Sequence, residues 1–529
     1  MSSESIAVQT QSGLMLGSVV GDRTVAGVLQ SGARRHPERP LLVYDDGSGE
    51  HLTLSWAAIA KRTEAVAAEL ERRGIGAGAR IHVHLPNRPE FLLVWFAAAR
   101  LGASIVPTNL ASPAPEVAYV IEHSGACCTV TDAEGRPVSE AAWAATGTRG
   151  PIIECEADGL MGLTEGEASA PMPHNSAELG VLYTSGTTSR PKGVRITHAN
   201  YVYVGEVVAG ALRMRPDDRV LIVLPLFHAN AQYYTTMSVL VTGATLILSR
   251  RFSASRFAEQ AIAHGATLSS LFSAAVRMIL AKQPAPHWRN TPLRAIIFGQ
   301  NLSLGELAQW DDRLGVPLVQ LYGMTETIGP PLINSLFGDA RRTSIGRTTL
   351  GYRCRIVRED GTDVMVGEPG QLLVQGEPGV SLMAGYLDDE AATAAALRDG
   401  WLATGDIVRL DEDGLVTFVD RDKDLIKRAG ENVAASEVES VLRDHPDVRD
   451  ACVVGVPDAM REEAIAAFVV RHDDAAVSEE AIVAWCAERL ASFRVPGSVQ
   501  IVDELPRTAV GKIQKHVLKA RWLEREVGA

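Results

Sequence analysis

Apolar residues along the chain alternate between helical and strand-like spacing. Residues 54–73 carry apolar side chains three and four positions apart, which predicts an amphipathic helix, and 89–101 predicts another. Short apolar runs at 81–85 and 103–107 predict strands that alternate with these helices. Alternation of this kind is typical of a mostly parallel α/β sheet.

More strands are predicted toward the middle of the chain, and the pattern changes after about residue 345. The apolar runs lie at 179–183, 220–224, 244–248, 296–298 and 318–322. Residues 356–361 and 371–375 then predict a smaller β-rich subregion. After residue 420 the strands and helices are short and closely spaced, which predicts a separate α+β unit. We therefore divide the chain into a lead-in over 1–22, a large N-terminal core over 23–420 and a C-terminal α+β domain over 421–529.

Composition and charge restrict the possible partners. The 529 residues are too many for one ordinary core, and the net charge of −13 argues against a nucleic-acid or anionic-membrane surface. The six cysteines show no C-x-x-C spacing, which favours a reducing compartment. The N-terminus lacks the basic and apolar regions of a signal peptide, and the longest apolar run, 91–99, is too short to cross a bilayer. We therefore expect a cytoplasmic protein without nucleic-acid or membrane partners. Its oligomeric state is not predicted.

A loop rich in hydroxyl groups follows the strand at 179–183. Its candidate phosphate-binding residues are Thr184, Ser185, Gly186, Thr187, Thr188 and Lys192. Backbone N–H groups, hydroxyls and a cation are the partners that polyphosphate oxygens need. The loop is not a Walker A motif, because no Gly-Lys-Ser/Thr occurs in it. By residue type alone, a solvated Ser/Gly loop would explain it equally well.

The order of residues 183–193 resembles the signature loop of the adenylate-forming superfamily, which comprises acyl-CoA synthetases, luciferases and peptide-synthetase adenylation domains. Four later segments match in the same order, so the resemblance covers nearly the whole chain; they are 322–326, 404–406, 420–424 and 506–512. Ser189 stands where the family usually has Gly, which would stiffen the loop. The runs 322–334 and 427–432 are most similar to the crotonobetaine/carnitine–CoA ligase-like branch, which includes relatives that activate nitrous acid for diazotisation.

The resemblance implies an AMP-forming, acid–CoA ligase-like enzyme that uses ATP and Mg²⁺. A small acid would react with ATP to give an acyl-AMP and pyrophosphate, and the acyl group would pass to coenzyme A. The close alternative is another acceptor, such as an aromatic amine that attacks activated nitrite. A nucleotide-binding sensor on the same fold is a non-enzyme alternative, against which the matches at Lys512, Glu326 and the hinge argue.

The family match also assigns roles to individual residues. Thr325 would contact phosphate, Glu326 would bind Mg²⁺, and Lys512 would bridge the acid and the α-phosphate as charge shifts in the transition state. Lys423 matches the hinge about which the mobile C-terminal domain rotates between an adenylating and a thioester-forming orientation. The other expected nucleotide contacts are Tyr322 at adenine, Asp406 and Arg421 at ribose, and Gly299, Gln300, Asn301 and Gly323 nearby.

The predicted acid and coenzyme A contacts complete the site. His228 and Asn230 follow a buried strand where the family gates the acid pocket, with Gly323 and Met324 opposite. A lone histidine is more often structural, but the family position favours His228 as a lining or catalytic residue. Lys427, Arg428 and Gly430 would meet coenzyme A, although charge at a solvated surface explains the first two equally well. Gln300 and Asn301 replace the small residues common in relatives, so we expect unpaired polar groups there and a small or polar acid rather than a long alkyl chain.

Overall fold

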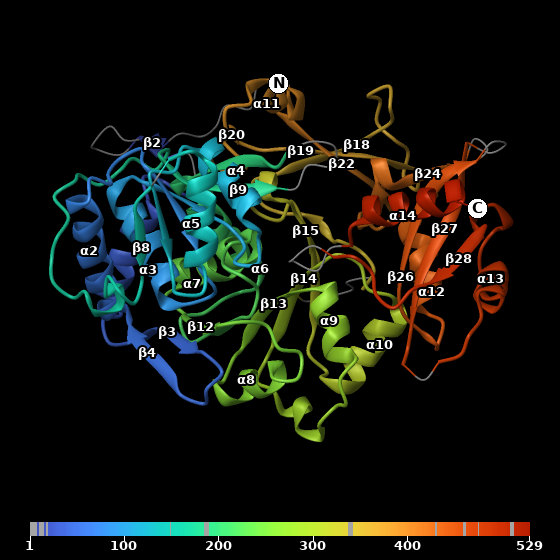
Figure 1. Ribbon diagram of the computed structural model, residues 1–529, viewed down its shortest axis with the longest axis horizontal. Coiled ribbons are helices and arrows are strands. Elements are labelled where there is room, and N and C mark those ends of the chain that lie inside the picture. The colour runs from blue at the N-terminus through green and yellow to red at the C-terminus, as the bar shows by residue number, and fades with distance from the viewer. Residues whose placement is uncertain are drawn as a thin grey trace.

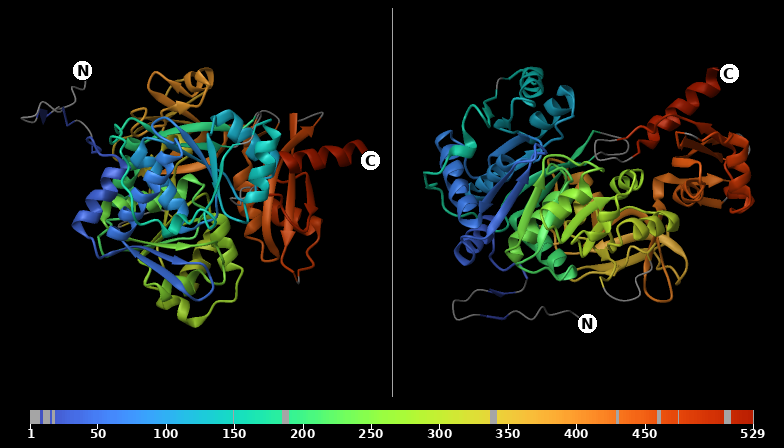
Figure 2. Two further views of the ribbon diagram at one scale, coloured as in Figure 1. Left: turned by 60° about the vertical axis from the view of Figure 1, so that its left-hand side comes forward. Right: turned by 90° about the horizontal axis from the view of Figure 1, so that it is seen from below.

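A computed structural model describes residues 8–9, 15–16, 19–148, 150–184, 190–336, 342–428, 431–458, 462–473, 475–507 and 513–528. Within these ranges the chain forms a large N-terminal α/β domain and a smaller C-terminal α+β domain (Figure 1). The C-terminal domain, drawn in red, lies at one end of the molecule in all three ribbon views (Figure 2). The predicted fold class is confirmed. The predicted lead-in contains two paired two-residue strands, β1 (Val8–Gln9) and β2 (Met15–Leu16).

The first large sheet has the strand order β20-β10-β9-β6-β5-β7-β8 among the described residues. Its strands are β5 (Arg80–His84), β6 (Ser104–Pro107), β7 (Cys128–Thr131), β8 (Ile152–Glu154), β9 (Glu178–Thr184), β10 (Lys192–Thr197) and β20 (Gly385–Tyr386). Its core from β8 to β9 is parallel, whereas β10 forms an antiparallel hairpin with β9 and pairs with β20 on its other side. The hairpin therefore sets the two ends of the predicted phosphate loop, Thr184 and Lys192, opposite one another.

The second large sheet has the order β17-β16-β15-β14-β13-β11-β12-β3-β4. Its strands are β3 (Pro40–Asp45), β4 (His51–Ser55), β11 (Arg219–Ile222), β12 (Thr245–Ser249), β13 (Leu268–Phe272), β14 (Ala295–Gly299), β15 (Leu318–Tyr322), β16 (Leu332–Ile333) and β17 (Arg347–Thr348). From β3 to β15 the pairs are parallel. In such a sheet, ligands bind beyond the carboxyl ends of the strands, which here include Gly299 and Tyr322.

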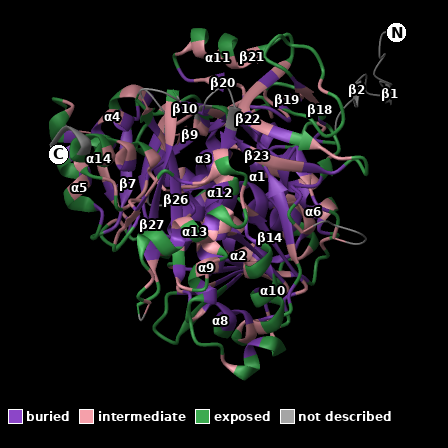
Figure 3. Cartoon of the chain, turned by 90° about the vertical axis from the view of Figure 1, so that its right-hand side faces the viewer, coloured by how far each residue is buried: buried purple, intermediate pink, exposed green. Residues whose placement is uncertain are grey.

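Helices cover the sheets, and one of them is apolar on every side. They are α1 (Val25–Arg35), α2 (Trp56–Arg72), α3 (Pro89–Leu101), α4 (Ala114–Ser124), α5 (Arg136–Ala145), α6 (His198–Ala211), α7 (Met237–Thr242), α8 (Phe257–Ala263), α9 (Ser273–Leu280) and α10 (Leu304–Arg313). From Phe91 to Ala99, α3 is almost fully inaccessible to solvent, as expected for a helix without a polar face. It ends at Gly102, whose φ of 70° is the left-handed conformation that glycine adopts at low cost. Figure 3 shows the buried strands enclosed by partly exposed helices and loops.

A third, antiparallel sheet forms the predicted β-rich subregion. It consists of β18 (Arg353–Val357), β19 (Pro369–Gln375), β21 (Leu397–Arg398), β22 (Trp401–Leu410) and β23 (Val416–Arg421), with α11 (Glu390–Ala396) beside it. After β23 the chain changes sheet within a few residues, next to the predicted boundary at 420. The boundary itself stays a prediction.

The C-terminal domain has its own hydrophobic core. Its elements are β24 (Leu425–Arg428), β25 (Glu431–Ala434), α12 (Ala435–Arg443), β26 (Val448–Asp458), β27 (Glu462–Arg471), α13 (Glu479–Ala487), β28 (Ser498–Ile501) and α14 (Lys515–Gly528). Apolar side chains of β26 and β27 pack on α12 and α13 from one face and on α14 from the other. A unit that buries its own core can move as a rigid body relative to its neighbour.

Close packing between α1 and α2 leads to a stability prediction. Trp56 is fully buried, and a methyl group on Gly32 would overlap its indole ring. Overpacking costs about 1–3 kcal/mol, whereas replacing a helical glycine with alanine gains about 1 kcal/mol. We therefore expect Gly32→Ala to lower the thermal unfolding midpoint. Gly210→Ala is the matched control, because that helical glycine faces open space, and it should leave the midpoint unchanged or raise it. Equal midpoints for the two variants would contradict this packing argument.

Candidate active site

The carboxyl end of β15 joins two sheets through a buried tyrosine and a buried carboxylate. The Tyr322 hydroxyl donates to Asp406 Oδ2 at 2.5 Å, and Arg421 Nε lies 3.3 Å from Asp406 Oδ1. Asp406 and Arg421 are cross-strand neighbours on β22 and β23. Burial, followed by the Asp406 charge, raises the pKa of Tyr322 well above its ordinary value. The sequence prediction named all three residues, and the structure brings them together.

A second carboxylate follows β15 by four residues. Glu326 is 5% exposed and lies in a short 3₁₀ turn, Thr325–Thr327. Its Oε1 accepts a hydrogen bond from the Tyr386 hydroxyl at 3.0 Å, and the Lys192 ammonium lies 4.9 Å from the centre of the Tyr386 ring. Burial and the Glu326 charge raise the pKa of Tyr386. Tyr386 thus links the predicted metal ligand to the predicted phosphate-loop lysine, and it was missed from the sequence.

The predicted acid side of the site follows β11. His228 is half-buried, its ring meets Phe272 edge to face at 5.3 Å, and its Nδ1 accepts the main-chain N–H of Asn230 at 3.3 Å. A neutral histidine that accepts at Nδ1 carries its proton on Nε2. A Cβ atom on Gly323 would come within 2.5 Å of the Tyr234 hydroxyl. This contact is a physical reason for glycine between Tyr322 and Met324, and Met324 itself is half-buried.

The structure corrects the expectation for Gln300 and Asn301. Gln300 Oε1 accepts from the Ser273 hydroxyl at 2.8 Å, and Asn301 Oδ1 accepts from Gln320 Nε2 at 2.9 Å. Gln320 Nε2 also donates to the Gln300 main-chain oxygen at 3.0 Å. The side-chain carbonyls are therefore paired inside the protein rather than left free to reject an alkyl chain. Gln300 has a φ of 75°, a left-handed conformation in which a non-glycine residue is strained.

The C-terminal domain separates two basic residues that the sequence grouped together. Lys427 is exposed, whereas Arg428 is 9% exposed and donates to the main-chain oxygens of Phe493 and Val495, both at 2.9 Å. The guanidinium therefore holds a loop of its own domain, and the predicted coenzyme A contact of Arg428 gains no support from this arrangement. Lys423 lies in the 3₁₀ turn Asp422–Asp424. The predictions for Ser185, Gly186, Thr187, Thr188, Gly430 and Lys512 fall outside the described residues.

Contacts across the predicted hinge were also missed. Ser436, at the start of α12, donates its main-chain N–H to Asp420 Oδ2 at 3.0 Å and its hydroxyl to the Val419 oxygen. Lys515 pairs with the buried Glu439 at 3.1 Å. Burial raises the pKa of Asp420, although the nearby Lys515 charge opposes this shift. No motif in the sequence indicates these contacts.

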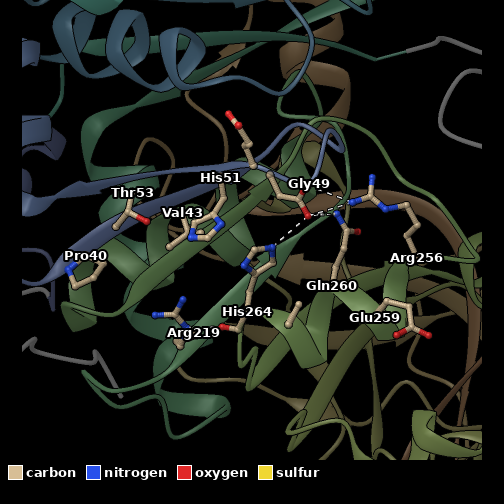
Figure 4. A pocket seen from close by; sticks show the side chains of 13 residues that line it. Pro40, Val43, Gly49, His51, Thr53, Arg219, Arg256, Glu259, Gln260 and His264 are labelled. Atoms are coloured by element: carbon tan, nitrogen blue, oxygen red, sulfur yellow. Dashed lines mark hydrogen bonds and ion pairs between the residues drawn. The ribbon is translucent and has the colours of Figure 1, made fainter.

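A cavity of about 450 Å³ lies elsewhere, between α8 and the β3–β4 edge of the second sheet (Figure 4). In that sheet, five strands lie between β4 and β15, so the cavity is remote from β15; they are β3, β12, β11, β13 and β14. Its buried carboxylate, Asp45, already accepts from Gln260 Nε2 at 2.9 Å and from His264 Nε2 at 3.2 Å. None of the predicted site residues lines this cavity, and the candidate site remains the one at the end of β15.

Comparison with known proteins identifies the family of this chain. Residues 29–387 match the family model described as AMP-binding enzyme, and residues 437–512 match the AMP-binding enzyme C-terminal domain. A crotonobetaine/carnitine–CoA ligase of Salmonella arizonae is 35% identical over 524 residues, which cover 95% of this chain and all of that protein. The branch expected from the sequence is therefore confirmed.

Two solved structures share this fold over nearly the whole chain. ATP-bound MatB from Rhodopseudomonas palustris superposes with a TM-score of 0.84 at 27% identity, covering 94% of this chain and 99% of that one. The o-succinylbenzoate–CoA synthetase MenE of Bacillus subtilis, in complex with its acyl-adenylate intermediate, has a TM-score of 0.83 at 29% identity and covers 94% and 98%.

These relatives support adenylation of an acid by ATP followed by transfer to coenzyme A, and they do not favour the alternative of nitrite activation for an amine acceptor. Separately, no helix among the described residues is long and apolar enough to cross a membrane. Two family models match in order, and the relatives are covered almost completely. This chain therefore belongs to the AMP-binding enzyme family and is an AMP-forming acid–CoA ligase.

Proposed function

We propose that this enzyme activates a small acid at the carboxyl end of β15, with ATP held between Asp406 and Glu326. The observation that carries the proposal is that both carboxylates, each with a fixed hydrogen-bond donor, flank the same strand end. Asp406 and Arg421 would bind ribose, since a carboxylate that accepts from both ribose hydroxyls is a recurrent nucleotide contact. Lys192 and the hydroxyl of Thr184, facing each other across the β9–β10 hairpin, would meet phosphate oxygens.

Glu326 fits a magnesium ion that arrives with ATP. Mg²⁺ is usually held by one or two carboxylates together with substrate phosphates. Among the described residues, no cluster of three or more acidic, histidine or cysteine side chains could hold a metal unaided, so a phosphate-borne ion suits the single carboxylate. When bound, Mg²⁺ would neutralise charge on the phosphate oxygens. The Tyr386 hydroxyl holds Glu326 in place for this role.

The reaction has two steps. A carboxylate oxygen of the acid attacks the α-phosphorus of ATP, and pyrophosphate leaves. The coenzyme A sulfur then attacks the acyl carbon, its proton goes to solvent, and AMP leaves with the electrons of the broken C–O bond. Activation replaces a poor leaving group with AMP. We assign Lys512 to the first step, Lys427 to coenzyme A and Lys423 to the rotation that exchanges the two faces of the C-terminal domain, on the strength of their motif positions.

The direct test is pyrophosphate release with ATP, Mg²⁺ and a panel of acids, with and without coenzyme A. We expect release with a small acid, and thioester formation only when coenzyme A is present. Nitrite belongs in the panel as the alternative substrate. Release with nitrite alone would overturn the proposed acid.

Tyr386→Phe tests the positioning of Glu326. A hydrogen bond to a charged group contributes about 1.5–3 kcal/mol, so we expect roughly a tenfold or greater rise in the KM for Mg-ATP, with little change in the KM for the acid. Tyr44→Phe on β3, which four intervening strands separate from β15 in the sheet, is the matched control. An unchanged KM for Mg-ATP would show that Tyr386 does not position a metal ligand.

Lys512→Ala tests whether adenylation and thioester formation use different faces of the C-terminal domain. Adenylation needs the lysine charge at the α-phosphate, so pyrophosphate release should be abolished, while a pre-made acyl-AMP should still be converted to the thioester. Lys519→Ala is the control, since that lysine pairs with Glu463 on the same domain. Equal loss of both steps in a folded Lys512→Ala protein would remove this assignment.

Lys423→Pro tests the hinge. Proline holds φ near −65° and removes the main-chain donor, which should block rotation. We expect a first turnover of pyrophosphate to survive and steady-state thioester formation to fall at least tenfold. Lys423→Ala, which keeps backbone freedom, should retain turnover. If the proline variant turns over at the normal rate, rotation about Lys423 is not part of the cycle.

A further inference from the structure

Asn230 carries a buried polar atom that the protein does not satisfy. The residue is 3% exposed, and its side-chain oxygen Oδ1 has no hydrogen-bond partner. Folded proteins leave few such atoms, and each one costs about 1–3 kcal/mol. A cost of this size calls for an explanation, and a group on a bound ligand is one.

The neighbouring polar side chains show that this segment is able to satisfy its own groups. The amide of Gln232 is fully buried, yet its Oε1 accepts from Tyr201 at 2.5 Å and its Nε2 donates to the Leu226 oxygen at 2.7 Å. The hydroxyls of Thr235 and Thr236 both donate to the Ala231 oxygen at 2.8 Å. Asn230 therefore differs from the polar residues that follow it, because those bond to the protein and its carbonyl does not.

The backbone around Asn230 has an uncommon conformation. Residues Ala231–Thr236 form a π-helical turn, with Asn230 as the residue that precedes it. Such turns are rare and occur frequently at functional sites, because they shift side chains away from regular helical positions.

The contacts of this segment place Asn230 on the acid side of the active site. His228, two residues before, meets Phe272 at the end of β13. Tyr234, four residues after Asn230, has its hydroxyl against Gly323, and the Tyr233 hydroxyl lies 3.5 Å from the Thr325 oxygen. The segment thus packs against the turn that follows β15. Since the side-chain carbonyls of Gln300 and Asn301 are paired within the protein, Asn230 is the better candidate for a hydrogen bond to the acid substrate.

We propose that Asn230 Oδ1 accepts a hydrogen bond from the substrate, and hence that the acid carries a hydroxyl or amino group at a distance from its carboxylate. This inference rests on the proposed function, because it concerns the acid pocket of the same site. A plain alkyl acid offers no donor and would leave Oδ1 unsatisfied. A keto acid offers only an acceptor and would face the Asn230 carbonyl unfavourably.

The test compares acids of equal chain length that differ only in the polar group. Pyrophosphate release is measured as kcat/KM for butanoate, 3-hydroxybutanoate, 4-hydroxybutanoate, 4-aminobutanoate and 3-oxobutanoate. We expect at least one donor-bearing acid to exceed butanoate and the keto acid by about tenfold or more. The hydroxy and amino arms distinguish the two kinds of donor.

Variants then locate the effect at Asn230. Asn230→Leu removes the carbonyl at similar volume, so the ratio between the preferred acid and butanoate should fall to near one. Asn230→Asp keeps the shape and adds a negative charge, so it should shift the substrate preference toward 4-aminobutanoate. This variant also serves if the leucine variant folds poorly. Gln232→Met is the matched control. A purely structural loss in the same segment should lower kcat/KM for all the acids together and leave the ratio between them unchanged.

The outcomes separate this inference from the proposed function. If the native enzyme releases pyrophosphate with butanoate as efficiently as with every donor-bearing acid, the inference fails and the proposed adenylation stands. An unchanged ratio in a folded Asn230→Leu protein likewise overturns it. If no acid supports pyrophosphate release, the proposed function fails, and the inference fails with it.

Discussion

The hydrogen bond from Tyr322 to Asp406 is the interaction on which the site depends. It joins the end of β15, in the second large sheet, to β22, in the third sheet. A buried carboxylate is costly unless it is paired, and Asp406 meets this requirement with a tyrosine hydroxyl on one oxygen and Arg421 on the other. Because β22 pairs with β23, which leads directly into the predicted hinge, the same bond links the nucleotide site to the C-terminal domain.

Local patterns predicted the parts of the structure that depend on local physics. Helix α3 has the predicted bounds, 89–101, because its apolar run is bounded by Pro89 and by the left-handed Gly102. The strand at 318–322 is β15, and the motif residues at its end lie where parallel strands place ligands. Arg428 shows where a local signal was available and was not used. In β24 it alternates in phase with the buried Ile426, whereas Lys427 points the other way, as the period of two in a strand requires.

Contacts between distant segments could not be predicted in this way. Tyr386 lies in a two-residue strand, sixty positions after its partner Glu326. The two meet because β20 pairs with β10 and because the Met383 N–H donates to the Glu326 main-chain oxygen at 2.9 Å. The positive φ of Gln300 is likewise invisible in the sequence, because glutamine rarely adopts it. That strained turn directs the carbonyls of Gln300 and Asn301 toward protein donors. The sequence argument noted the polar side chains of Gln300 and Asn301 but could not tell whether their atoms were paired within the protein.

The junction between the domains shows how a tight arrangement can still be reversible. Ser436 bonds to Val419 and Asp420. Ser436 follows Lys423 along the chain, whereas both of its partners precede it. A rotation about Lys423 would break these bonds, but the cores on the two faces of the β26–β27 sheet would remain intact. A neutral hydrogen bond such as the one to Val419 contributes about 0.5–1.5 kcal/mol, and the bond to the buried Asp420 carboxylate contributes about 1.5–3 kcal/mol. The Lys515–Glu439 pair lies within the C-terminal domain and would travel with it. Among the described residues, the contacts that this rotation would break include the bonds of Ser436, whereas the domain cores stay intact, and such an arrangement suits the proposed alternation between two half-reactions.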